Sequence, residues 1–188
     1  MAVDTTKIRA YTSGLVAVSG YGVSNPTLPV GDPSVALNAA IYKELGALTD
    51  EGITESTSQE YNDIFMWQGN ALAASLPGKY SKTFTFAALE TNAVSLGLTF
   101  AGSTLTSTAY GVSIAEKPPA RDIRAWVLHG IDGTRLQRIV VPLGQLTERG
   151  DAVWSSQDAT AYEYTVKCFV DASGNVAYRY YGDVALTL

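Results

Sequence analysis

The segment from Gly46 to Gly69 holds the chain's densest set of side chains that could do chemistry. Its carboxylates are Asp50, Glu51, Glu55, Glu60 and Asp63, with no His, Cys, Lys or Arg between them. Such a cluster could serve an active site or bind Ca²⁺, which takes about six to eight oxygen ligands around a glycine turn. Asp50-Glu51-Gly52 lacks the alternating acidic spacing of calcium loops, and Thr and Ser fill the gaps. The alternative is an extended, hydroxyl-rich loop that leads into a strand and contacts another surface.

The other reactive residue types are scarce. His129 is the only histidine, so any histidine-dependent relay or metal site would require it. It follows a strand-like run beside Gly130, where a surface or edge histidine is the simpler interpretation. Cys168 alternates with Tyr and Val, which favours a small core side chain. No P-loop, GxSxG, HExxH or CxxC motif occurs, so the sequence predicts no enzyme, no cofactor and no metal.

Composition narrows the function classes further. Charged residues make up 16% of the 188 residues, against about 25% in typical soluble domains. The formal net charge is -5 and no basic cluster occurs, which argues against nucleic-acid binding. A polar but weakly charged surface suits lasting contact with other protein. One cysteine excludes an internal disulfide, and no stretch has the pattern of a signal peptide or membrane span. We therefore expect synthesis in a cytoplasm and no membrane partner.

The elements that must position these residues are short and mostly strand-like. Period-2 alternation between turn signals predicts strands over 14–20, 79–89, 107–114, 121–130, 135–144, 162–170 and 176–182. Asp132-Gly133 predicts a hairpin turn, and "DASGN" predicts another. The one convincing helix covers 89–101. The pattern predicts a single domain over 1–188, mostly β, built as an antiparallel sandwich or barrel with one flanking helix.

Two longer stretches carry a resemblance to a known family. "LGALTDEGITESTSQEYNDIFMWQG", followed by "KTFTFAALETNAVSLGLTF", resembles the major tail proteins, or tail tube proteins, of long-tailed, siphovirus-type bacteriophages. The shared pattern is an acid-Gly-Ile turn, a hydroxyl-acid run into an apolar strand that ends at Gly, a Phe-rich strand, and an "ETN" helix start. "IRAYTSGLVAVSG" fits the family's N-terminal strand before a Pro-rich loop, and "GNVAYRYYGDVAL" fits its terminal strand.

The resemblance implies a structural virion protein that stacks as hexameric rings into a tail tube. Such a tube surrounds the tape-measure protein, meets a tail terminator and distal tail or baseplate proteins at its ends, and conducts DNA during ejection into the host. Six copies at -5 give about -30 per ring, which repels phosphates rather than holding them. DNA would then pass without specific binding.

Two segments are therefore candidate contact sites between subunits. Residues 46–69 are expected to form an inter-ring loop and strand, and 14–40 an extended, exposed N-terminal loop region. The residues proposed for inter-ring contact are Asp50, Glu51, Gly52, Ile53, Glu55, Ser56, Thr57 and Ser58. Those proposed for N-terminal contact are Pro26, Leu28 and Pro29.

Two alternatives stay open. A tail terminator or distal tail protein would form isolated rings and no tube. A carbohydrate-binding sandwich would present exposed aromatic platforms, for which Trp67, Trp126 and Trp154 are the available tryptophans. Two of these lie in predicted strands, which favours core or interface packing for them.

Overall fold

The computed structural model describes residues 4, 7–21, 23, 26–183 and 186. This part of the chain is mostly antiparallel β-structure with one short helix, as the sequence predicts. The elements in chain order are β1 (Ser13–Ser19), β2 (Tyr42–Glu44), β3 (Leu48–Phe65), β4 (Leu72–Ala88), α1 (Ala93–Thr99), β5 (Thr104–Thr108), β6 (Gly111–Ala115), β7 (Ile123–Asp132), β8 (Arg135–Arg149), β9 (Tyr162–Phe169) and β10 (Tyr178–Gly182).

One eight-stranded sheet contains every described strand except β5 and β6, which form a separate hairpin. Its main path runs β2-β1-β7-β8-β9-β4-β3, and β10 pairs with β8 beside that path. Because β7 occupies one edge of β8, the other edge is divided between two strands. Leu136 to Val140 pairs with β10, and Leu143 to Arg149 pairs with β9. The sheet ends at β2 and β3, so the barrel alternative is wrong.

The sheet folds over a core that both of its halves share. The core takes Val16 and Val18 from β1, Trp126 and Leu128 from β7, Ile139 and Val141 from β8, Phe84 and Phe86 from β4, and Tyr164 and Val166 from β9. The strand register shifts at Arg124/Trp126 in β7 and at Leu146/Glu148 in β8. Bulges of this kind bend a strand and increase its twist, which lets one sheet supply both layers.

The N-terminal segment covers the opposite face of β1 and β7. Leu28, Leu37 and Ile41 pack on a second buried cluster formed by Ala17, Tyr42, Ala125 and Val127. Arg138, which is 3% exposed, fixes this segment by donating to the backbone oxygens of Pro33 (2.8 Å) and Val35 (2.7 Å). Most residues of 26–41 are exposed and outside regular structure, but Pro33 is buried and Leu28, Leu37 and Ile41 are partly buried against the chain's own sheet.

The helix predicted over 89–101 forms only over α1, Ala93–Thr99. Asn92 caps it: its side chain accepts from the backbone amides of Val94 and Ser95, and Ser95 Oγ accepts from Asn92 N. Asn92 must leave helical geometry to cap, so Leu89 to Thr91 lie outside the helix. Phe100 ends the helix as its C-cap residue.

Two of the predicted strand arrangements need correction. The run over 107–114 folds back at Ala109-Tyr110 into the β5–β6 hairpin, where Gly111 has a φ of 124°. "DASGN" does form a turn, but β10 then pairs with β8 instead of β9. The hairpin across Asp132-Gly133 is confirmed by the β7–β8 ladder.

Candidate functional site

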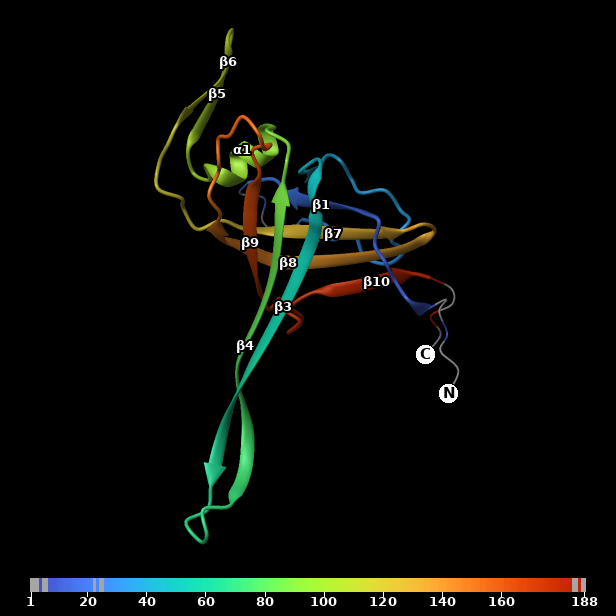
Figure 1. Cartoon of the computed structure of the whole chain (residues 1–188), viewed down its shortest axis with the longest axis vertical. Coiled ribbons are helices and arrows are strands. Elements are labelled where there is room, and N and C mark those ends of the chain that lie inside the picture. The colour runs from blue at the N-terminus through green and yellow to red at the C-terminus, as the bar shows by residue number, and fades with distance from the viewer. Residues whose placement is uncertain (1–3, 5–6, 22, 24–25, 184–185, 187–188) are drawn as a thin grey trace.

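The most prominent feature is a hairpin arm formed by β3 and β4. The two strands pair from Leu48/Ala88 at the body to Phe65/Leu72 near the tip. Their distal halves leave the body and project as a two-stranded arm at the bottom of Figure 1. Met66 N donates to Ala71 O (2.8 Å) across the turn, which Gly69 and Asn70 close at φ of 74° and 51°. Left-handed backbone of this kind favours Gly and Asn.

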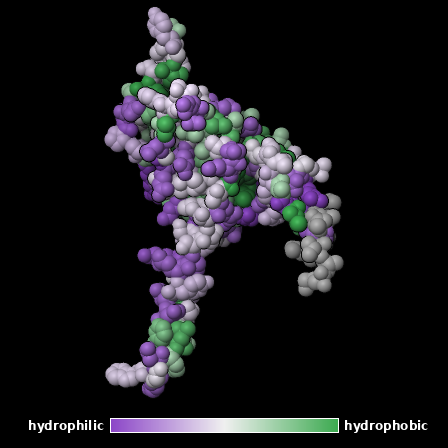
Figure 2. Space-filling model, viewed as in Figure 1, coloured by the Kyte–Doolittle hydropathy of each residue, from purple (hydrophilic) through white to green (hydrophobic). Residues whose placement is uncertain are grey.

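The distal arm exposes large apolar side chains. The exposed ones are Tyr61, Ile64, Phe65, Met66, Trp67, Leu72, Leu76 and Tyr80, and Trp67 is 97% exposed. Figure 2 shows apolar residues gathered on the lower part of the arm, away from the body. Exposed apolar patches are typical of surfaces that contact other molecules.

Ion pairs fix the arm at its base. Glu55 of β3 accepts from Lys82 Nζ of β4 and from Arg179 Nη2 of β10. Burial opposes ionisation of Glu55, but the hydrogen bonds from Arg179 and Lys82 outweigh it and lower the pKa of its carboxyl group. Lys82 is 8% exposed, so its charge depends on this partner. The arm is therefore attached to both halves of the folded sheet.

The outer face of β3, β4 and β9 is rich in hydroxyl groups. The ladder places Thr54 opposite Thr85 and Thr85 opposite Thr165, and the two Oγ1 atoms of Thr85 and Thr165 are 3.4 Å apart. The next row places Ser56 opposite Thr83. Where this face meets the start of β3, a groove is lined by four carboxylates: Asp50, Glu51, Asp151 and Glu163. The same row continues from Thr83 to Lys167 of β9, an exposed cation. The face thus carries mostly hydroxyl groups, one lysine, and four carboxylates at one end.

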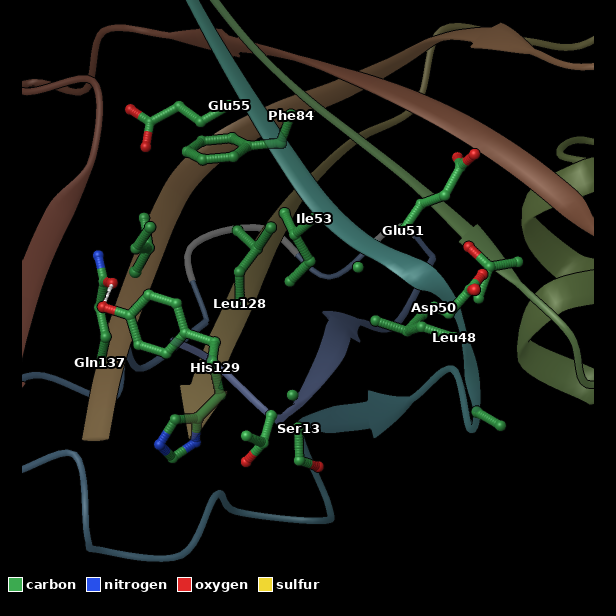
Figure 3. Close-up of a pocket in the computed structure, with 18 residues that line it drawn as sticks. Ser13, Leu48, Asp50, Glu51, Ile53, Glu55, Phe84, Leu128, His129 and Gln137 are labelled. Atoms are coloured by element: carbon green, nitrogen blue, oxygen red, sulfur yellow. Dashed lines mark hydrogen bonds between the residues drawn. The ribbon is translucent and has the colours of Figure 1, made fainter. Parts of the chain in front are cut away.

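A larger cavity, of about 680 Å³, lies between β1, β7, β8 and the start of β3. Figure 3 shows Leu128, Ile53 and Phe84 at its centre, with the Glu55 carboxylate pointing away from those of Asp50 and Glu51. The imidazole of His129 also points away from these acids. The cavity therefore does not bring an acid and a base together for proton transfer.

His129 and Cys168 are both buried. His129 is 8% exposed, which corrects the expectation of a surface or edge histidine, because β7 continues to Asp132 and places it inside the strand. Burial, with the Arg138 guanidinium nearby, lowers the pKa of His129. Cys168 lies in the core as predicted, and burial raises the pKa of its thiol to about 11. Neither group is placed to act as a nucleophile or base.

Within the described residues, no group of three or more His, Cys, Asp or Glu side chains could hold a metal ion. The one helix in the described part of the chain is too short to cross a membrane.

The proposed contact residues lie at the base of the arm, and they are strand rather than loop. Asp50 to Ser58 all belong to β3, and each residue from Ile53 to Ser58 pairs with one in β4. Ile53 packs on the core. Pro26, Leu28 and Pro29 are not fully buried, and Leu28 contacts the chain's own second cluster. The two candidate segments are not brought together as one site.

The residues named individually from the sequence did not include the exposed apolar side chains between Tyr61 and Leu76, although the candidate segment 46–69 extends past Trp67. The signal was available. A strand-like apolar run ends at Gly69-Asn70, and a second strand-like run follows at once. This pattern predicts a hairpin whose tip is apolar.

The fold and its surface define a β-rich protein with a projecting arm that exposes apolar side chains. Residues 1–184 match the family described as phage tail tube protein, so the chain belongs to that family. It is therefore a structural component of a phage tail. No curated protein matches the chain. In a solved structure of an extracellular contractile injection system, "PVC sheath/tube terminator in extended state", one chain resembles it with 11% identity and a TM-score of 0.49, over 94% of this chain and 99% of that one.

Proposed function

We propose that this chain polymerises as stacked hexameric rings into the tail tube, the conduit for DNA ejection, and that the hairpin arm joins one ring to the next. The observation that carries the proposal is the arm itself. Its apolar side chains are exposed over its distal half. Burying them on another copy removes apolar surface from water, at about 25 cal/mol per Å².

The open edge of β3 supports ring formation. Among the described strands only β4 pairs with β3, so the edge from Leu48 to Phe65 is free. A long free edge invites pairing with another chain, and monomeric proteins usually block it. Head-to-tail contacts that close by rotation form rings, which stack further when the ends also match. Edge pairing within the ring would use the body half of this edge, Leu48 to Ser58, and contacts between rings would use the distal arm from Tyr61 onward.

The hydroxyl-rich face of β3, β4 and β9 is the surface we assign to the bore. The opposite side of the molecule is covered by the N-terminal segment, whereas this face is left open by the described chain. Its hydroxyl groups carry no charge, and the four carboxylates at its end, which repel phosphate, outnumber its one exposed cation, Lys167. DNA and the tape-measure protein would meet a surface that does not retain a polyanion.

Electron microscopy of the purified protein tests this function. We expect hollow tubes of variable length. Isolated rings of uniform height would instead fit a tail terminator or distal tail protein, and a monodisperse monomer that binds glycans would fit a carbohydrate-binding module.

A further inference from the structure

Resting on the proposed stacking, we infer that the arm tip of one copy docks in a specific apolar groove beside α1 of a copy in the next ring. The groove has a volume of about 580 Å³. Its apolar lining comes from α1, the segment that follows it and the end of β1, and consists mainly of Val18, Ala93, Val94, Gly97, Phe100 and Leu105. Its size suits large side chains such as those at the arm tip.

The groove and the arm tip lie at opposite ends of the molecule. Figure 1 shows α1 and the β5–β6 hairpin at the top of the long axis and the β3–β4 turn at the bottom. Translation of one copy along this axis therefore brings the arm tip of one copy toward the α1 end of the next. A contact between unlike ends can repeat without limit, as a tube requires.

Charge selects this groove over the two others. The large cavity under β3 is lined by Asp50, Glu51 and Glu55, and the groove on the outer face is lined by four carboxylates. The α1 groove is lined by two cationic side chains, Lys43 and Arg124, and by no carboxylate among the described residues. Arg124 is already paired with Asp122 (2.6 Å), so Lys43 is the main source of positive charge in the groove.

The arm supplies the complementary charge. Glu60 and Asp63 flank its apolar tip, against one ammonium group from Lys79. The Arg124 guanidinium also stacks on the ring of Tyr21, 5.1 Å from its centroid, beside the groove. Aromatic and cationic side chains of this kind are common at protein interfaces.

Gly97, which lines the groove, independently supports the docking of a side chain from another copy. Glycine inside a helix costs roughly 1 kcal/mol relative to alanine, yet a Cβ at this position would meet no atom within 4 Å. Neither a positive φ nor packing within the chain explains the residue. A side chain inserted by another copy would use the room that Gly97 leaves.

Disulfide trapping between copies tests the docking directly. Trp67→Cys and Gly97→Cys are prepared as separate proteins, mixed at about one part in ten with wild-type subunits, assembled and oxidised mildly. We expect a dimer on a non-reducing gel from the mixture of both variants and none from either alone. The matched control pairs Trp154→Cys with Gly97→Cys, since Trp154 is also highly exposed, at 90%. This mixture should give at least tenfold less dimer.

The outcomes separate the docking site from the stacking itself. Tubes that form without a disulfide between the Trp67→Cys and Gly97→Cys subunits overturn the groove as the docking site and leave the proposed function intact. Failure of the wild-type protein to form tubes overturns the proposed function as well.

A second pair of variants tests the docking without cross-linking. Gly97→Phe fills the groove and should raise the critical concentration for tube formation at least tenfold. Gly97→Ala should leave that concentration within twofold of the wild-type value. Equal assembly by both variants would also overturn the docking site.

Discussion

Arg179 in β10 donates to the carboxylate of Glu55 in β3, although the two residues are 124 positions apart in sequence. Lys82 of β4 donates to the same carboxylate. Three strands from different parts of the sheet thus meet where the arm leaves the body. A projecting hairpin has few contacts of its own, so this cluster determines how firmly the arm is held.

Replacing Glu55 by Gln should destabilise the folded chain by roughly 1–3 kcal/mol, because Lys82 and Arg179 lose a shared charged partner. The free energy of unfolding, measured in urea at neutral pH, checks this. Glu60→Gln is the matched control and should change it by less than about 0.5 kcal/mol, since Glu60 lies in the exposed arm. Equal effects of the two substitutions would contradict the role of the cluster.

The same pair of proteins has an expected pH dependence. The folded chain lowers the pKa of Glu55, so its ion pairs add stability at pH values above the ordinary glutamate pKa of about 4.3. This contribution is lost as the pH falls through the lowered, folded-state pKa. The difference in stability between wild type and Glu55→Gln should therefore shrink from about pH 6 to the acidic range. A difference that grows on acidification would have the wrong sign.

Arg138→Met should destabilise the chain by roughly 2–3 kcal/mol, because the backbone oxygens of Pro33 and Val35 lose a buried charged donor. Hydrogen exchange should also show weaker protection over 28–42. Arg135→Met is the control, since its side chain is 34% exposed and its ion pairs are long, at 3.8 Å. Unchanged exchange in Arg138→Met would show that the N-terminal layer is held by its apolar contacts alone.

Two glycines should respond oppositely to alanine. A Cβ at Gly144 would lie 2.5 Å from Trp126 Cδ1 and 2.9 Å from Val166 Cγ1, so Gly144→Ala overpacks the core and should cost roughly 1–3 kcal/mol. Gly97→Ala meets open space in a helix and should stabilise by up to about 1 kcal/mol. Thermal unfolding of the two variants measures both changes in stability. A stable Gly144→Ala protein would mean that Trp126 can move aside.

Labelling of assembled tubes tests the face assigned to the bore. A cysteine at Ser56, which is exposed on that face, should react with a small maleimide and be protected from one carrying a polymer of about 20 kDa. Val35→Cys, on the N-terminal layer that covers the other side, should react with both reagents. If the large reagent modifies Ser56→Cys as fast as Val35→Cys, the face is on the outside of the tube.

Local sequence patterns correctly predicted the features that depend on neighbouring residues, such as the two faces of a strand or a hairpin turn. The alternation of Phe84 and Phe86 with Thr83 and Thr85 gave β4 its buried and open faces correctly. Cys168 was placed in the core for the same reason. Asp132-Gly133 predicted its hairpin because the turn needs only its own residues.

Long-range pairing could not be predicted in this way. β10 follows a turn after β9 yet pairs with β8, because β9 leaves half of one edge of β8 open. Asp50 to Ser58 were expected in a loop because their side chains are polar, but they belong to β3, and Ile53 to Ser58 pair with β4. A strand that is solvated on its outer face can carry such residues. His129 is buried inside β7, where it pairs with Leu15 of β1 and Arg138 of β8, so its burial depends on a strand far earlier in the chain.

Shortening the arm tests the central claim most directly. Gln59 and Tyr80 face each other in the ladder, so an Asn-Gly turn can replace residues 60–79 and leave Glu55, Ile53 and the body in place. Deleting Glu51–Ser58 would be less clean, since it removes Ile53 from the core. Electron micrographs of the wild type should show long tubes, and those of a folded, arm-shortened protein should show at most separate rings. Tubes of wild-type length from the shortened protein would contradict the claim that the arm joins the rings.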